Sequence, residues 1–209
     1  MRVLLTGATG LIGGSIAQAL LRDGHEVVCA LRDPGRLAIA HPRCTAFAAD
    51  LASVPSAAWW QPRLAGIDAV VNAVGILREQ GTQTFDALHA RAPAELFRAC
   101  AAAGVRCAVQ VSALGADARG SQPYQTSKRE ADDVLRGLPL AGAVVQPSLV
   151  YSPTGPSTGL FLQLASLPAL LFPLRGGMEV QPVHVDDVVD GVLAVLREPA
   201  APVETVAFV

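Results

Sequence analysis

The sequence predicts an α/β fold in which a doubly wound parallel sheet is covered by helices on both faces. Short apolar runs alternate along the chain with longer segments of helical periodicity, as is typical of βα units around a buried parallel sheet. The 209 residues, 51% of them hydrophobic, suffice for one domain with a full core. We expect strands at residues 2–6, 26–31, 45–48, 69–73, 107–112, 143–146 and 205–208.

Four helices are expected between these strands, at residues 11–23, 85–103, 124–136 and 186–196. In the first, Ile12, Ile16 and Leu20 share one face, and Gly24 can take the left-handed conformation that ends many helices. The last begins with Asp186 and Asp187, which we interpret as first-turn acids favoured by the helix dipole.

The alternation of strands and helices stops at residues 148–182, where prolines interrupt an apolar segment. We expect this segment to form a small C-terminal substrate-side lobe within a single domain spanning residues 1–209. The chain ends on an apolar strand without a polar tail, which is consistent with a further C-terminal domain in a longer protein.

The composition and charge of the chain restrict the classes of partner that we expect the protein to bind. A net charge of −2 offers no positive surface for a phosphate backbone, so we expect no nucleic acid partner. The longest apolar stretch, residues 160–174, is interrupted by Gln163 and falls short of the ~18 residues of a membrane-spanning helix. No CxxC spacing occurs, so we expect buried thiols, and neither a metal site nor a disulfide, at Cys29, Cys44, Cys100 and Cys107. These features predict a cytoplasmic monomer or homodimer without a membrane span.

A glycine triple, Gly7, Gly10 and Gly13, directly follows the first predicted strand and opens the first helix. In this setting the first glycine makes a tight turn, the second lets the backbone approach a pyrophosphate, and the third lets helix and strand pack closely. Unpaired N–H groups at the helix N-terminus then face the phosphates. The sequence therefore predicts a dinucleotide site.

The end of the second strand distinguishes the two nicotinamide dinucleotides. A basic residue there accommodates a 2′-phosphate, whereas an acidic one holds the ribose 2′-hydroxyl. Arg32 comes first, followed by Asp33, with Arg36 a turn later. We expect NADP in preference to NAD, while Asp33 leaves NAD as an alternative.

Tyr124 and Lys128 are four residues apart on a predicted helix, so they share one face. Lys128 is the only lysine in the chain. A neighbouring ammonium favours the phenolate and lowers the pKa of a tyrosine, and a lysine also has donors for ribose hydroxyls. We expect this pair to transfer a proton. Ser112 ends a buried strand, where open α/β sheets bind ligands, and its hydroxyl can donate to a substrate carbonyl.

These motifs resemble those of the short-chain dehydrogenase/reductase superfamily. The segments 112–116, 146–151 and 181–187 resemble its extended and atypical branches, which include NAD-dependent epimerase/dehydratases and the nucleotide-binding accessory subunit of respiratory complex I. The resemblance implies a Rossmann-type sheet with catalytic Ser112, Tyr124 and Lys128. It also implies a cofactor bound by Gly7, Thr9, Gly10, Leu11, Ile12, Gly13, Arg32, Asp50, Leu51, Ala73, Val74, Gly75, Lys128, Pro147 and Ser148.

One position departs from the family pattern. Many relatives carry asparagine where this chain has His89, so we expect His89 to pack or cap and not to relay protons.

The leading functional hypothesis is an NAD(P)(H)-dependent oxidoreductase acting on a carbonyl or alcohol. The alternatives are a non-catalytic NADP(H)-binding scaffold or redox sensor, motivated by the apolar residues 160–174, and an NAD-dependent epimerase or dehydratase. The predicted lobe has few charges, which favours a small or apolar substrate over a nucleotide sugar.

Overall fold

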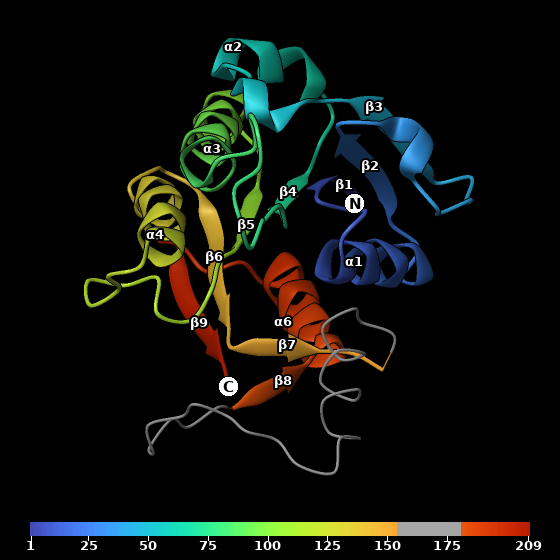
Figure 1. Ribbon diagram of the computed structural model, residues 1–209. Helices are drawn as coiled ribbons and strands as arrows, with labels where there is room; N and C mark the ends of the chain where they lie inside the picture. Colours follow the sequence, from blue (N-terminus) through green and yellow to red (C-terminus); the bar gives the residue numbers. More distant parts are fainter. Residues whose placement is uncertain (154–180) are drawn as a thin grey trace.

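A seven-stranded parallel sheet forms the centre of the molecule (Figure 1). The computed structural model describes residues 1–153 and 181–209. The strand order is β3-β2-β1-β4-β5-β6-β9, so the direction of winding reverses between β1 and β4. The strands are β1 (Arg2–Thr6), β2 (Glu26–Leu31), β3 (Cys44–Ala48), β4 (Ala69–Asn72), β5 (Cys107–Val111), β6 (Ala141–Pro147) and β9 (Glu204–Phe208). This is the predicted Rossmann-type α/β fold.

Helices cover both faces of the sheet. The α-helices of the described residues are α1 (Leu11–Arg22), α2 (Ala57–Trp60), α3 (Ala92–Ala103), α4 (Pro123–Arg136) and α6 (Val185–Arg197). Helices α1 and α6 pack together on one face, whereas α2, α3 and α4 lie on the other (Figure 1). The short helical turns are η1 (Pro34–Arg36), η2 (Leu51–Ser53), η3 (Gln61–Arg63) and η4 (Asp86–Arg91), and the last of these is π-helical.

Each face of the sheet has its own hydrophobic core. Side chains of β1, β2 and β5 alternate between the two cores, as the period of a strand requires. Leu5 and Val109, for example, face α1 and α6, while Leu4 and Ala108 face the other helices. Burial on both faces explains why these strands are continuously apolar in sequence.

The expected elements are present, with ends that differ by one or two residues. The predicted helix 85–103 begins with the π-helical η4 and continues as α3. Gly24 has a φ of +85°, which confirms the left-handed conformation after α1. Asp186 and Asp187 occupy the first turn of α6, and the His184 ring accepts a hydrogen bond from Asp186 N.

A second, two-stranded parallel sheet joins β7 (Leu149–Tyr151) to β8 (Pro182–His184). These strands are the two ends of the predicted lobe at residues 148–182. Most of that segment, including residues 160–174, lies outside the described residues. Within the described ranges, no helix is long and apolar enough to cross a membrane.

The four thiols are free, and all but the half-buried Cys44 are buried. Cys29 and Cys44 lie on adjacent strands with their sulfur atoms 4.0 Å apart. Burial raises the pKa of Cys29 and Cys100 to about 12, so neither thiol is a ready nucleophile. The expectation of buried thiols is confirmed for Cys29, Cys100 and Cys107.

Candidate active site

The glycine loop joins β1 to α1 as a close-packed turn. Gly7 has a φ of +78°, and Gly10 N donates a hydrogen bond to Gly7 O at 2.9 Å. A Cβ at Gly13 would lie 2.2 Å from Gly7 O, and one at Gly7 would lie 2.5 Å from Ala73 O. Gly10 differs, because its nearest non-neighbouring atom, Gly7 O, is at 3.4 Å. The protein itself therefore demands glycine at positions 7 and 13, whereas at Gly10 the surrounding backbone leaves room for a Cβ.

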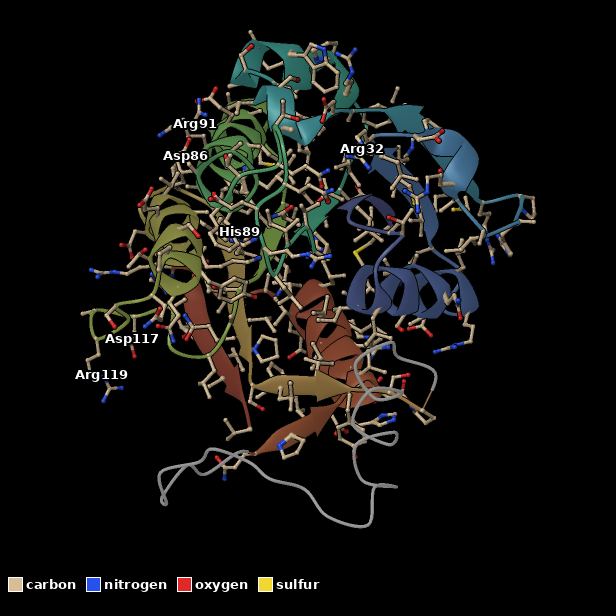
Figure 2. All side chains as sticks on the ribbon, in the orientation of Figure 1. Arg32, Asp86, His89, Arg91, Asp117 and Arg119 are labelled. Carbon is tan, nitrogen blue, oxygen red and sulfur yellow. The ribbon has the colours of Figure 1, made fainter. Side chains whose placement is uncertain are left out.

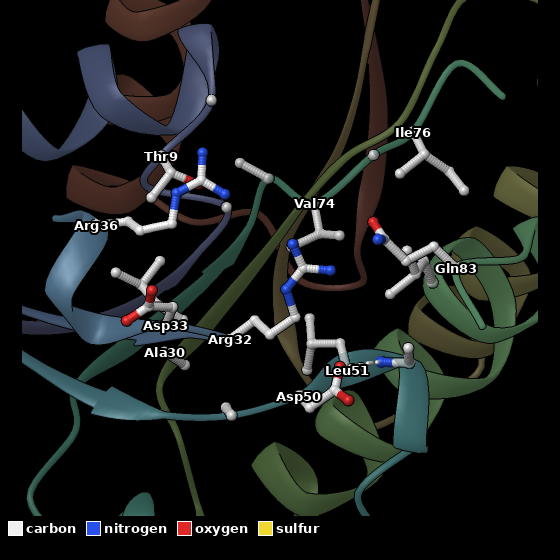
Figure 3. A pocket seen from close by; sticks show the side chains of 18 residues that line it. Thr9, Ala30, Arg32, Asp33, Arg36, Asp50, Leu51, Val74, Ile76 and Gln83 are labelled. Carbon is white, nitrogen blue, oxygen red and sulfur yellow. Dashed lines mark hydrogen bonds between the residues drawn. The ribbon is translucent and has the colours of Figure 1, made fainter. Parts of the chain in front are cut away.

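A cleft of about 250 Å³ opens beside this loop, at the carboxyl ends of β1 to β4 (Figure 3). Nine of the predicted cofactor residues line it: Gly7, Thr9, Gly10, Arg32, Asp50, Leu51, Ala73, Val74 and Gly75. This position, at the reversal of strand order, is where open α/β sheets bind their ligands. Bare backbone at the glycines and the N-terminus of α1 fit the pyrophosphate of a dinucleotide.

Six predicted cofactor residues do not line the cleft. Leu11 and Ile12 begin α1 and pack against the core, and Gly13 packs against Gly7. Pro147 ends β6, and Ser148 bonds through its amide to Phe208 O and through its hydroxyl to Gln181 O. The sixth, Lys128, does not line the cleft but contacts two residues that do, Val74 and Gly75.

The charged side chains of the cleft differ in their hydrogen bonding. Asp33 accepts a hydrogen bond from Gly35 N at 3.0 Å and so caps η1. Arg32 and Arg36 extend into the cleft in Figure 3, and neither has an ion-pair partner among residues 1–153 and 181–209. The cleft therefore presents two guanidinium groups beside a carboxylate that is already hydrogen-bonded.

Lys128 is buried where the ends of β4 and β5 meet α4. Its side chain is 2% exposed, and Nζ donates to Val74 O at 2.9 Å and to Val111 O at 3.1 Å. A Cβ on Gly75 would lie 3.3 Å from Nζ, so the lysine tip passes directly over this cleft residue. Burial lowers the pKa of Lys128 to about 8, although the nearby Asp132 charge opposes the shift. One of its three N–H donors is left for another acceptor.

Tyr124 lies one turn before Lys128 on the same helix face and is half-buried. Its ring packs edge-on against His89 and Phe85, with centroid distances of 5.3 and 5.9 Å. Burial raises the pKa of Tyr124, with no lowering by Lys128. The expectation that the ammonium lowers this pKa is therefore wrong.

His89 is fully buried within η4, in the interior of the molecule (Figure 2). Its Nε2 accepts from Ile76 N at 2.9 Å, so Nδ1 carries the proton and donates to Ser127 Oγ at 3.1 Å. The Ser127 hydroxyl in turn donates to Tyr124 O. Burial, aided by Lys128, lowers the pKa of His89 to about 3. Both ring nitrogens are used, so His89 packs as expected and connects the loop after β4 to the start of α4.

Ser112 follows β5 and is buried, as predicted for a strand-end residue. Its Oγ donates to Asp132 Oδ2 at 2.6 Å, so the hydroxyl proton points to this carboxylate and not to the cleft. Sequence reasoning missed Asp132. Its spacing of four from Lys128 and eight from Tyr124 was a signal, but an acid at helical spacing usually faces solvent.

The fold and the cleft together define a Rossmann-type dinucleotide-binding protein. The family model described as NAD(P)H-binding matches residues 7–199, and the chain belongs to this family. It is 32% identical over 208 residues to a ceramide reductase of Caulobacter vibrioides, with 94% of this chain and 61% of that protein covered. It is also 30% identical over 230 aligned positions to a 3-diazoavenalumate denitrifying reductase of a Streptomyces species, covering 96% and 73%.

Solved structures of the NAD-dependent epimerase/dehydratase family, the extended short-chain dehydrogenases, share the fold. The UDP-glucuronic acid 4-epimerase of Bacillus cereus in complex with NAD has a TM-score of 0.78 at 19% identity, covering all of this chain and 77% of that one. An NAD-dependent NDP-hexosamine 5,6-dehydratase involved in tunicamycin biosynthesis has a TM-score of 0.73 at 21% identity, covering 99% and 75%. The chain is thus a member of the NAD(P)H-binding family that shares its fold with these epimerases and dehydratases, and it spans 61% of the length of the ceramide reductase.

Proposed function

We propose that the protein is an NADP(H)-dependent oxidoreductase that reduces a carbonyl group through Ser112, Tyr124 and Lys128. The observation that carries the proposal is the position of Lys128. Its buried ammonium bonds to Val74 in the cofactor cleft and to Val111, the residue before Ser112. A buried charge is costly, and a structural role alone would be met by an apolar side chain.

Each of the three residues has a role, and that of Ser112 is to form a hydrogen bond with the substrate oxygen. The nicotinamide, when bound, supplies or accepts the hydride at the substrate carbon. Tyr124 gives its phenolic proton to the substrate oxygen and is then reprotonated from solvent, so that the carbonyl becomes an alcohol. Lys128 has one N–H left for a ribose hydroxyl.

NADP is the cofactor that the cleft favours. A 2′-phosphate is a dianion that needs paired donors, and the guanidinium groups of Arg32 and Arg36 are both directed into the cleft (Figure 3). The acid that would hold a 2′-hydroxyl, Asp33, is hydrogen-bonded to Gly35 N.

An apolar substrate suits the residues at the catalytic end of the sheet. All five exposed large hydrophobic side chains of the described residues follow the carboxyl ends of four adjacent strands, β4, β5, β6 and β9. The five exposed hydrophobic residues are Leu77, Leu114, Leu149, Tyr151 and Val209. By contrast, the charged residues Asp117 and Arg119 on the loop after Ser112 form an ion pair with each other at 3.2 Å and project from the periphery (Figure 2). The name of the ceramide reductase relative supports the same substrate class.

An epimerase or dehydratase is the alternative reaction in this family, and a binding scaffold is the alternative without catalysis. In epimerisation and internal dehydration the hydride returns to the substrate, so no cofactor is consumed overall. Net oxidation of NADPH with ketones of increasing alkyl chain length, compared with nucleotide sugars, distinguishes the reactions. A protein that binds NADPH and converts neither class would support the scaffold.

Tyr124→Phe tests the catalytic assignment. We expect kcat to fall by about 100-fold or more, because the variant loses the only proton that the phenol can transfer. The dissociation constant for NADPH, measured by fluorescence titration, should stay within about twofold. Unchanged kcat in Tyr124→Phe would refute the proposed function.

A further inference from the structure

A buried carboxylate lies directly behind Ser112. Asp132 is on α4, one turn after Lys128, and is completely inaccessible to solvent. Its Oδ2 accepts from Ser112 Oγ at 2.6 Å and, more weakly, from Gln146 Nε2 at 3.4 Å. The other oxygen, Oδ1, is buried and has no hydrogen-bond partner in the described parts of the chain.

An ionised carboxylate with one bare oxygen is unfavourable in such a place. Burial raises the pKa of Asp132 to about 6, even though the Ser112 bond, Arg136, Gln146 and Lys128 all lower it. The two cations lie on α4 itself, and the neutral groups that face the carboxylate are Ser112, directly after β5, and Gln146, on β6. The Asp132 carboxyl can therefore hold or release a proton near neutral pH.

The protonation state of this carboxyl determines what hydrogen bond Ser112 can offer to a substrate. A serine hydroxyl has one proton to donate and two lone pairs. When Asp132 is ionised, it accepts that proton, and Ser112 presents only lone pairs to a substrate. When Asp132 is protonated, its own O–H can donate to Ser112 Oγ, and the serine proton is free to turn toward a substrate oxygen.

We propose that Asp132 is a positioning residue that switches Ser112 between hydrogen-bond donor and acceptor, so that carbonyl reduction requires the protonated form of Asp132. The inference rests on the proposed function, because it assigns Ser112 to the substrate oxygen. No bond to carbon is formed or broken in the switch. One proton moves between solvent and the Asp132–Ser112 pair.

The pH profile of carbonyl reduction tests the switch. In the wild-type protein we expect kcat to fall with rising pH above about 6, by about tenfold per pH unit for a single ionisation, until it levels at the rate of Ser112→Ala. Asp132→Asn cannot ionise and should lack this limb of the profile. Asp133→Asn is the matched control, since Asp133 is on the same helix but forms exposed ion pairs with Arg129 and Arg136. It should keep the wild-type profile.

The double variant Asp132→Asn, Ser112→Ala separates positioning from packing. If Asp132 acts through Ser112, replacing Asp132 has no further effect on kcat once the hydroxyl is gone, whereas independent effects would multiply. Thermal unfolding and NADPH titration establish that each variant is folded. Should Asp132→Asn fail to fold, Ser112→Ala alone decides, because the limb near pH 6 must disappear with the hydroxyl.

The two proposals fail in different ways. A wild-type limb that persists in Asp132→Asn or in Ser112→Ala, or a flat wild-type profile between pH 5 and 8, overturns the switch. If Tyr124→Phe is inactive at the same time, the proposed function stands. Full activity in Tyr124→Phe overturns the proposed function itself.

Discussion

At the scale of single residues, the site is built from charged groups whose hydrogen bonds decide their use. Asp33 and Arg32 are neighbours in sequence at the end of β2, and both line the cleft. Oδ1 of Asp33 accepts a hydrogen bond from Gly35 N, while the Arg32 guanidinium has no ion-pair partner in the described ranges. Adjacent residues of opposite charge thus differ in what they can offer a ligand.

Arg32→Ala should change cofactor preference. A hydrogen bond to a charged group contributes about 1.5–3 kcal/mol, so loss of the contact to a 2′-phosphate should weaken NADPH binding by about 10- to 100-fold. NADH binding should change little, because NADH lacks this phosphate. Fluorescence titration with both cofactors measures the difference, and Arg22→Ala, an exposed arginine at the end of α1, is the control. Equal weakening of both cofactors would argue against the NADP assignment.

At the scale of elements, two helices bring the site together. Helix α1 begins at the glycine loop, and α4 carries Tyr124, Lys128 and Asp132 on one face at intervals of four residues. The four-residue spacing in the sequence predicts that Tyr124 and Lys128 share a face. It does not predict that Asp132 faces the protein interior, because that depends on β5 and β6 lying beneath the helix.

The glycine loop provides a paired test of fold against ligand binding. Gly13→Ala places a Cβ 2.2 Å from Gly7 O, so we expect lower stability and loss of NADPH binding together. In Gly10→Ala the new Cβ would lie 3.4 Å from Gly7 O, so the fold should tolerate the substitution while the methyl group obstructs the pyrophosphate. Thermal unfolding and NADPH titration on both variants separate the effects. Unimpaired NADPH binding in Gly10→Ala would place the pyrophosphate elsewhere.

At the scale of the whole molecule, burial on both faces of the sheet shifts the pKa values of titratable groups of the site in the direction that favours their neutral forms. The pKa of His89 is lowered from 6.5 to about 3, and that of Asp132 is raised from 3.8 to about 6. The two shifts act oppositely on stability. As the pH falls below 6.5, the unfolded state binds more protons than the native state at His89, whereas the raised pKa of Asp132 makes the native state bind more protons at that carboxyl.

His89→Gln should reduce the sensitivity of the fold to acid. A histidine with a lowered pKa contributes stability above pH 6.5, and this contribution is lost as the pH falls toward 3, by at most about 1.4 kcal/mol per pH unit. Glutamine does not titrate, so the free energy of unfolding of the His89→Gln variant should fall less between pH 6.5 and 4.5 than that of the wild-type protein. Urea denaturation at several pH values measures both slopes. Identical slopes would show that His89 can be protonated without unfolding.

The sequence by itself determined the features that depend on local periodicity. The order of strands and helices, the glycine loop and the shared face of Tyr124 and Lys128 follow from spacings of two, three and four residues, which backbone geometry converts directly into structure. The tertiary structure alone decided the hydrogen bonds of Ser112 with Asp132 and of His89 with Ile76. These partners are separated by 20 and 13 residues, so they meet only because parallel strands place their carboxyl ends at one edge, beneath α4.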